Sequence, residues 1–483
     1  MIIQNGFSCE REIKIFLNMY FDADEEPAVI SNFSYDGGTI NAYTVIYFNG
    51  GEYADDYYFE FDADGKSKKL IKKIFTAACT KSFIHAAAKI RGISNPWGVM
   101  CGIRPAKNVR ELCEEGYSYD EIRGIFRDVY EVRPDKTELA VTVAKNEAEI
   151  LSKIDKNAVG LYIGIPFCPT RCLYCSFVST DIRVSGKYMD TFCEKLIEEI
   201  QKTADVLREN ALGVQSVYIG GGTPTALDAR NLERVLAAVS ESFDLSRAEE
   251  YTLEAGRADT ITREKLEIAK RYGVDRISIN PQTMNDDTLR RVGRRHSAAD
   301  VVECFKTARK IGFDNINMDL IAGLPGESYD MFCRSLDEVA RLDPEDITVH
   351  TLSIKHGARL KNTDFRHTAE INRMLSYAQS KMEKCGRVPY YMYRQKNMAG
   401  NLENVGYAKP GKMSMYNIGI MEETQTVIAM GGGGSTKIVL PNDIVRVYNY
   451  KDPKEYAEKF ENIIDRKNEI SEILGGVYNV GQR

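Results

Sequence analysis

The feature that most constrains this sequence is a group of three cysteines, Cys168, Cys172 and Cys175, spaced C-x3-C-x2-C. The apolar run 161–165 precedes them and is typical of a buried strand. Thiolates hold iron–sulfur clusters, and a four-iron cluster offers four corners. Three cysteines close together leave one iron free for another ligand. The spacing therefore favours a [4Fe-4S] cluster with one open iron.

Two other interpretations of the cysteine group are weaker but stay open. A structural zinc ion normally takes four protein ligands, and no second C-x2-C or H-x3-H segment stands out. A disulfide would suit an exported protein, but the start, Met1 to Gly6, lacks the basic and then apolar order of a secretory signal. The cluster interpretation accounts for the spacing best.

Composition limits the classes of function. A chain of 483 residues predicts two or three domains, and 43% hydrophobic residues are enough to build their cores. The net charge of −6 gives no basic footprint, which argues against nucleic-acid binding. No apolar run approaches membrane-spanning length, and the eleven cysteines are mostly scattered, as in a reducing compartment. We expect a cytoplasmic protein.

The first 150 residues predict a small α+β and helical module of unknown role. Strand-like runs at 42–48 and 57–61 flank the turn residues Asn49 to Gly51 and indicate a hairpin. Helical periodicity is expected at 67–90, 106–115, 118–130 and 136–151. Cys79, Cys101 and Cys113 are interpreted as small buried residues.

Strands and helices alternate through residues 151–355, which form the expected core. The strands are predicted at 161–166, 216–220, 251–254, 276–280, 315–321 and 346–352. The helices between them are predicted at 187–209, 228–243, 263–272, 286–292, 298–311 and 329–342. This alternation indicates an α/β fold with a parallel sheet, either doubly wound or a partial (β/α)6-type barrel. The motif-bearing residues follow the strands' C-terminal ends, which favours the barrel.

Three of these strand ends carry groups suited to a ligand. The run Gly220 to Thr225 exposes backbone N–H and C=O groups, although a simple turn would explain the glycines too. Glu254 ends a strand, and Asp319 lies inside an apolar one, so each needs a partner. A ligand group or a salt bridge to Arg294 or Arg276 would satisfy them.

These motifs together resemble the oxygen-independent coproporphyrinogen III oxidases and their radical-SAM relatives. The shared segments are Tyr162 to Cys168, Cys172, Tyr174-Cys175, Gly220 to Thr225, Ile277 to Gln282 and Asp319 to Gly326, in family order, within about residues 158–440. Tyr393 to Met398 and the glycines at Gly431 make the chain similar to the coproporphyrinogen dehydrogenase variant of this family.

The resemblance implies roles for individual residues. Cys168, Cys172 and Cys175 would ligate the [4Fe-4S] cluster, with Tyr162 and Tyr174 beside it. Gly221, Gly222 and Thr223 would contact S-adenosyl-L-methionine, and Glu254 would hold its polar groups. Gln282, Arg294 and Asp319 match positions that bind a second S-adenosylmethionine in the oxidase.

Two departures from the family pattern concern the substrate. The oxidase has a His where this chain has Gly164, and a further Cys where it has Phe177. The related haem-chaperone branch carries a His-Asn-x-x-Tyr-Trp signature, and the matching segment here, Met415 to Met421, lacks its His and Trp. That difference argues against the chaperone.

The last part, residues 356–483, is expected to be a C-terminal α+β extension that covers the substrate. A helix is predicted at 361–384 and an aromatic strand at 388–393, while the glycines 431–434 form either a closing loop or a turn. The tail beyond Lys451 looks helical and charged, as on a solvated face.

The resemblance implies the reaction as well. A 5′-deoxyadenosyl radical would start the oxidative decarboxylation of two propionates of coproporphyrinogen III to vinyl groups, which gives protoporphyrinogen IX in haem biosynthesis. The alternatives are a haem-delivery protein without oxidase activity, or another radical-SAM reaction on a tetrapyrrole. An external electron donor and acceptor would be needed. Arg294, Arg394 and Lys396 are candidate cations for the substrate carboxylates.

Overall fold

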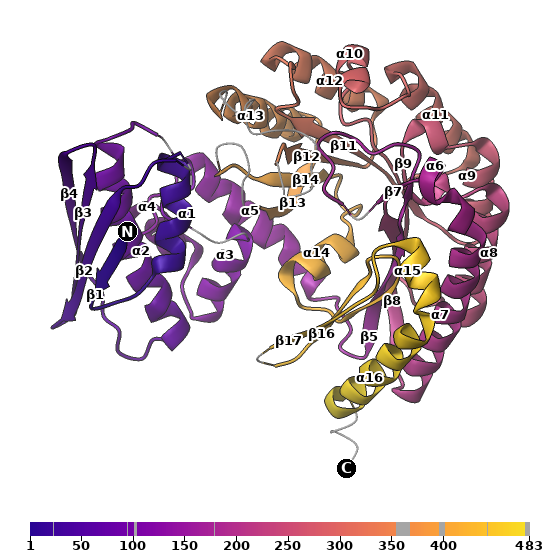
Figure 1. Cartoon of the computed structure of the whole chain (residues 1–483), viewed down its shortest axis with the longest axis horizontal. Coiled ribbons are helices and arrows are strands. Elements are labelled where there is room, and N and C mark those ends of the chain that lie inside the picture. Colours follow the sequence, from indigo (N-terminus) through magenta and orange to yellow (C-terminus); the bar gives the residue numbers. More distant parts are fainter. Residues whose placement is uncertain are drawn as a thin grey trace. The chain divides into compact units, whose positions relative to one another are not determined.

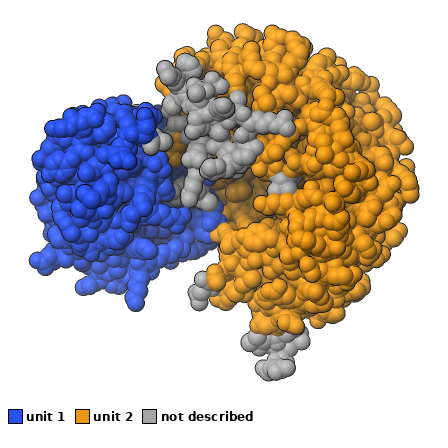
Figure 2. Space-filling model, viewed as in Figure 1, with its two compact units in different colours: residues 1–144, 394–396 blue, residues 145–393, 397–483 orange. Residues whose placement is uncertain are grey.

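The computed structural model describes residues 1–22, 24–93, 95–100, 104–177, 179–353, 368–395, 401–441 and 443–478. The chain forms two compact units, shown in different colours in Figure 2. Unit 1 contains residues 1–144 and 394–396, and unit 2 contains residues 145–393 and 397–483. The predicted site residues from Tyr162 to Asp319 all belong to unit 2.

Unit 1 is built on a four-stranded sheet of order β1-β2-β3-β4. Its strands are β1 (Ile2–Asn5), β2 (Ala28–Asp36), β3 (Thr39–Phe48) and β4 (Gly51–Glu60). The predicted hairpin is confirmed, because β3 and β4 are antiparallel and are joined by Asn49 and Gly50, both with positive φ. That backbone conformation matches the twist of a tight two-residue hairpin turn.

Helices complete unit 1. They are α1 (Glu10–Tyr20), α2 (Lys68–Ala88), α3 (Pro105–Glu114), α4 (Tyr119–Asp128) and α5 (Pro134–Leu151), the last of which continues into unit 2. Ser67 caps α2 and Ser118 forms a capping box with Glu121 on α4, so both helices begin where the sequence places capping residues. The four predicted helices of this part are confirmed.

Unit 2 contains the predicted parallel sheet. Its six central strands are β5 (Ala158–Ile165), β8 (Gly213–Gly221), β9 (Glu250–Gly256), β10 (Arg276–Ile279), β11 (Ile316–Ala322) and β12 (Asp346–Thr351), each parallel to the next. These apolar strands are buried almost throughout, as expected for a sheet covered on both faces.

The helices of unit 2 lie along the outer side of this curved sheet, as Figure 1 shows. They are α7 (Met189–Glu209), α8 (Ala229–Ser242), α9 (Arg263–Arg271), α10 (Asp286–Arg291), α11 (Ala298–Ile311) and α12 (Tyr329–Leu342). Short elements fill the connections: β6 (Phe167–Cys168), β7 (Thr180–Asp181), α6 (Ile182–Ser185), and the 3-10 turns η1 (Gly186–Tyr188), η2 (Pro224–Ala226) and η3 (Ala258–Thr260). The predicted barrel-like α/β fold is confirmed.

The C-terminal part extends the same sheet on both sides, giving the order β13-β14-β12-β11-β10-β9-β8-β5-β15-β16-β17. It contributes α13 (Thr368–Lys384), β13 (Val388–Tyr393), β14 (Asn404–Ala408), α14 (Met415–Glu422), β15 (Val427–Gly431), β16 (Ser435–Val439), β17 (Ile444–Tyr448), α15 (Pro453–Glu458) and α16 (Phe460–Tyr478). Residues 361–367 of the predicted helix lie outside the described residues. The assignment of residues 356–483 as a substrate-covering domain stays a prediction.

The expectation of a solvated C-terminal tail is wrong for one face of α16. Phe460, Ile463, Ile470 and Leu474 are buried at helical spacing, and the helix packs against α7. Lys467 lies on the same buried face, with Nζ 3.0 Å from Glu199 Oε1. The many charged residues of the segment occupy its other face, which hid the apolar stripe. Among the described residues, no helix is long and apolar enough to cross a membrane.

Candidate active site

The loop that carries the three cysteines follows β5 and is held by backbone hydrogen bonds on two sides. Gly222 N donates to Ile165 O and Thr223 N to Phe167 O, both at 2.8 Å, which joins the loop to the end of β8. Leu173 N donates to Val292 O at 3.0 Å, and Thr170 Oγ1 to Gly293 O at 2.9 Å. The loop is therefore fixed at the C-terminal edge of the parallel strands.

The three thiols of this loop lie near one another and are free. Cys168 and Cys172 are buried and Cys175 is half-buried. Burial, together with the neighbouring Cys172 and Cys168 thiols, raises the pKa of Cys175 to about 11. No three His, Cys, Asp or Glu side chains of the described residues converge on a single metal ion. In a four-iron cluster each thiolate binds a different iron, so convergence on one point is not required.

The glycines after β8 are required by their close approach to this loop. A Cβ on Gly222 would lie 2.7 Å from Phe167 O and 3.1 Å from Cys168 Sγ, and Gly221 has a φ of +110°. Thr223 Oγ1 lies 3.4 Å from Cys168 Sγ. A cradle of backbone atoms thus borders the thiols, where a side chain at Gly222 would intrude.

Glu254 closes this cradle from the end of β9. A Cβ on Gly220 would meet Glu254 Oε2 at 2.7 Å, and the backbone N–H of Gly221 donates to the Glu254 carboxylate. Burial raises the pKa of Glu254 to about 8, and the negative charge of Asp319 contributes. The neighbouring Asn280 side-chain oxygen is buried and accepts no hydrogen bond in the described part of the chain. These groups can receive a polar ligand with an ammonium group.

Tyrosines line the barrel beside the cysteine loop. Tyr162 on β5 and Tyr218 on β8 stack at 6.3 Å between ring centroids, and Tyr218 stacks on Tyr416 of α14 at 4.5 Å. Tyr174 packs against an apolar cluster that includes Val292, and its hydroxyl accepts from Arg294 Nε at 3.3 Å. Tyr218 and Tyr416 were not predicted as site residues.

Gln282, Arg294 and Asp319 lie at the ends of the next strands. Gln282 has a φ of +69°, and its N–H donates to Asp319 O at 2.8 Å, which links the end of β10 to β11. Arg294 is buried, and its Nη1 donates to Asn280 O at 2.6 Å. The structure thus brings the three residues to one edge of the barrel.

The predicted salt bridge of Asp319 to Arg294 or Arg276 needs correction. Its Oδ1 accepts from Asn317 Nδ2 at 2.8 Å and its Oδ2 lies 3.6 Å from His350 Nε2. Burial acts to raise the pKa of Asp319, but His350 and Asn317 outweigh it, so the pKa is lowered. Arg276 instead forms a buried ion pair with Asp346 at 2.6 Å. The register of β11 and β12 determines this arrangement, and the sequence pattern does not reveal it.

Arg257 was missed by the sequence analysis, although it lies in the center of the site. It follows β9, it is buried, and its Nη1 lies 3.7 Å from Cys172 Sγ. The available signal was an arginine three residues after Glu254, at the C-terminal end of a predicted barrel strand.

The two departures from the family pattern differ in their surroundings. A Cβ on Gly164 would lie 2.6 Å from Gly432 O, because Gly432 N donates to Gly164 O at 2.9 Å and holds β5 and the β15–β16 turn together. No side chain fits there without movement of the turn. Phe177, in contrast, is 69% exposed.

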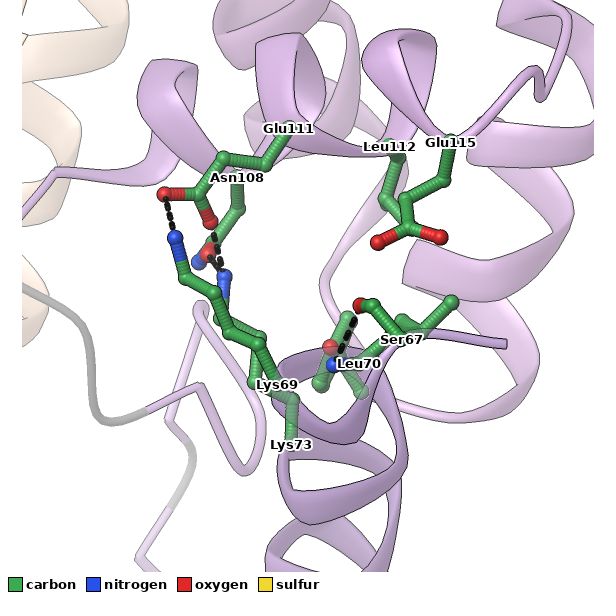
Figure 3. Close-up of a pocket in the computed structure, with 9 residues that line it drawn as sticks. Ser67, Lys69, Leu70, Lys73, Asn108, Glu111, Leu112 and Glu115 are labelled. Atoms are coloured by element: carbon green, nitrogen blue, oxygen red, sulfur yellow. Dashed lines mark hydrogen bonds and ion pairs between the residues drawn. The ribbon is translucent and has the colours of Figure 1, made fainter. Parts of the chain in front are cut away.

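Arg394 lies in unit 1. Its guanidinium stacks on the Trp97 ring and donates to Met100 O at 2.8 Å, so the structure assigns it contacts within that unit. Lys396 lies outside the described residues. Unit 1 also has a narrow crevice between α2 and α3 (Figure 3). Lys69 and Lys73 both pair with Glu111 there, so each of these charges has a partner.

Comparison with known proteins agrees with this geometry. Residues 162–339 match the radical SAM superfamily. The chain is 40% identical, over 416 residues, to the oxygen-independent coproporphyrinogen-III oxidase-like protein HemZ of Bacillus subtilis, covering 84% of this chain and 83% of that protein. It is 30% identical to the haem chaperone HemW of Lactococcus lactis, over 64% of this chain and 79% of the relative.

The solved structure of coproporphyrinogen III oxidase, HemN, from Escherichia coli is similar in fold. Its TM-score is 0.52 at 22% identity, over 66% of this chain and 72% of that one. Fold and motifs together define a radical-SAM protein. More narrowly, the chain belongs to the family of oxygen-independent coproporphyrinogen-III oxidase-like proteins, as its similarity to HemZ shows. The cofactors of this family are a [4Fe-4S] cluster and S-adenosylmethionine.

Proposed function

We propose that this protein removes two carboxyl groups from coproporphyrinogen III without oxygen and so forms protoporphyrinogen IX in the cytoplasm. Each round would convert a propionate into a vinyl group with loss of carbon dioxide, of one hydrogen atom that ends in 5′-deoxyadenosine, and of one electron that goes to an external acceptor. The observation that carries the proposal is the loop Cys168 to Cys175, fixed beside the Gly220 to Thr223 cradle and Glu254 at one barrel edge. The similarity to an oxidase-like protein supports the substrate class.

In this proposal Cys168, Cys172 and Cys175 hold the cluster. When bound, the cluster and S-adenosylmethionine supply the one-electron radical chemistry, and the protein supplies orientation and exclusion of solvent. The thiols fit this role, since they are free and Gly222 lets the backbone at the end of β8 approach Cys168 closely. The fourth corner of the cluster then has no cysteine ligand.

S-adenosylmethionine would lie along the glycine cradle. Gly221, Gly222 and Thr223 would contact it through backbone groups, and Glu254 would accept from its ammonium group. Tyr162 and Tyr174 would flank the cofactor. Gln282, Arg294 and Asp319, which lie together at the next strand ends, are the proposed contacts for a second S-adenosylmethionine. External one-electron carriers would supply and accept the electrons.

Haem delivery is the second candidate, because several relatives are haem chaperones. The His-containing signature that we expect in those relatives corresponds to residues that form α14 in this chain. In this chain α14 presents Tyr416 to the tyrosine stack. That position suits a wall of the barrel interior, and we therefore place delivery second.

The test is product analysis with the reconstituted, reduced protein under anaerobic conditions. We expect 5′-deoxyadenosine that depends on coproporphyrinogen III, together with stepwise loss of two carboxyl groups by mass spectrometry. Cofactor cleavage without decarboxylation would overturn the substrate and keep the radical-SAM chemistry. Tight haem binding without any cleavage would favour delivery.

A further inference from the structure

Arg257 connects the end of β9 to the cysteine loop through one nitrogen. Nη1 donates to Thr170 O at 3.0 Å and to Thr170 Oγ1 at 2.9 Å, and it lies 3.7 Å from Cys172 Sγ. The side chain is 4% exposed, so water does not compete for these contacts. The loop thus has a buried cation directly beside one of its three sulfurs.

The orientation of this cation is fixed from its other side. Arg257 Nε and Nη2 donate to the two oxygens of Asp259 at 2.9 and 2.7 Å, a paired geometry that a guanidinium fork makes with a carboxylate. The backbone carbonyl of Arg257 accepts from Thr260 N at 3.0 Å and from Thr260 Oγ1 at 2.8 Å. Nη1 is therefore held toward the loop.

A second guanidinium approaches the same sulfur. Arg294 interacts with the Cys172 thiol and donates to Tyr174 Oη at 3.3 Å. Among the described residues, Arg257 is the one of these two arginines with a paired carboxylate, Asp259, and His296 Nδ1 lies 3.5 Å from that carboxylate. The electrostatic environment of the Cys172 sulfur is therefore determined by Arg257, Arg294 and Asp259 together.

We propose that Arg257 is a positioning residue that sets the reduction potential of the cluster through the Cys172 sulfur. The inference rests on the proposed assignment of Cys172 as a cluster ligand. Hydrogen bonds to the sulfurs and nearby charge tune the potential of iron–sulfur clusters. The reduced cluster carries one more negative charge than the oxidised form. An N–H donor and a positive charge beside Cys172 therefore make the one-electron uptake from a low-potential donor easier.

Asp259 acts in the opposite direction. Its carboxylate partly neutralises the guanidinium, and its own charge lies on the far side of Arg257 from the sulfur. Removing the positive charge lowers the potential, and removing the negative charge raises it. If the Arg257–Asp259 pair only held the loop in place, the two substitutions would not shift the reduction potential in opposite directions.

The experiment compares Arg257→Gln, Asp259→Asn and a control, Arg263→Gln, whose side chain is exposed on the following helix. Each full-length protein is reconstituted anaerobically, iron and sulfide are quantified, and the potential is measured by redox titration followed by electron paramagnetic resonance. We expect a more negative potential for R257Q, a more positive one for D259N, and the wild-type value for R263Q.

An unchanged potential in R257Q with full iron content would overturn the inference. If R257Q does not take up iron, D259N decides, and a potential that stays or falls overturns the inference. A Cys172→Ala protein that keeps a full cluster would instead overturn the ligand assignment on which the inference rests.

Discussion

The buried charges around Glu199 and those around Cys172 lie in the same unit but differ in how fully their polar atoms are paired. Glu199 binds Lys467 Nζ, Asn449 Nδ2 and Gly431 N, at 2.7 to 3.0 Å, and Lys467 Nζ also donates to Ala429 O at 2.6 Å. These groups come from α7, α16, β15 and the residue that follows β17, and both oxygens of the Glu199 carboxylate have partners.

The edge that carries Cys172 is less completely paired. Asn280 Oδ1 is buried without a hydrogen-bond partner among the described residues, and Glu254 has a raised pKa that reflects its burial. Buried polar groups of this kind are costly unless something binds them. We infer from this comparison that the Glu199 group supports the fold, whereas the Cys172 edge is where we propose that the cofactors bind.

The substitution with the largest expected effect at the Cys172 edge is Cys172→Ala. We expect loss of nearly all cluster iron and no cleavage of S-adenosylmethionine, because a three-cysteine site has no spare thiolate. The control is Cys333→Ala, which removes a half-exposed thiol on α12 and should keep the iron content. Iron and sulfide analysis after reconstitution measures the effect, and an unchanged iron content in C172A would contradict the account.

Lys467→Met tests the fully paired group. It leaves the Glu199 carboxylate buried without its cation, and we expect a loss of about 3–5 kcal/mol in the free energy of unfolding. Lys459→Met removes an exposed pair with Glu455 and should leave the free energy of unfolding almost unchanged. Denaturant unfolding of the cofactor-free proteins distinguishes the two. Equal losses would show that the Glu199 group is not a support of the fold.

Glu254 provides a test by pH. Its pKa is raised from 4.5 to about 8 in the folded protein, so the folded state binds the proton more tightly than the unfolded state. The Glu254 contribution is therefore favourable below the unfolded pKa and is lost as pH rises from about 4.5 to about 8. In the cofactor-free Glu254→Gln protein, the change in the free energy of unfolding over this pH range should be smaller by a few kcal/mol, since each pKa unit corresponds to about 1.4 kcal/mol.

The matched control for that measurement is Glu264→Gln, whose carboxyl group is exposed on α9. Its stability should follow the wild-type protein at every pH. If the free energy of unfolding of Glu254→Gln changed with pH as that of the wild type does, the pKa of Glu254 would not be raised by burial.

The smallest expected effect concerns Gly164. A Cβ there would lie 2.6 Å from Gly432 O, so Gly164→Ala should cost about 1–3 kcal/mol by overpacking. Gly476→Ala on α16 meets no atom within 4 Å and should instead stabilise by about 0.5–1 kcal/mol, as alanine does in a helix. Thermal unfolding measures whether each of the two substitutions stabilises or destabilises the protein. A stabilised G164A protein would contradict the close approach of the β15–β16 turn.

Much of unit 2 could be predicted because its strands are continuous apolar runs that alternate with amphipathic helices. The three cysteines and the glycines 220–222 carry strong local signals, and the structure brings them together. The partner of Asp319 could not be predicted, since His350 reaches it only through the register of β11 and β12. Periodicity identifies strands but not which residues of two strands face each other.

The wrong prediction for the C-terminal tail has a different physical cause. The apolar stripe of α16 is interrupted by Lys467, which reads as a surface residue until Glu199, more than two hundred residues earlier, is placed against it. Arg257 was missed for a similar reason, because its contact with Cys172 joins two loops that are distant in the sequence. Long-range pairing of charges is what the sequence pattern alone does not provide.

The most direct test of the account is whether the cluster has an open iron that binds S-adenosylmethionine. The reconstituted, reduced protein would be measured by electron–nuclear double resonance with S-adenosylmethionine labelled with ¹⁵N in its amino group. The account predicts a nitrogen coupling in the wild type that Glu254→Gln weakens. An intact cluster without any such coupling would contradict it.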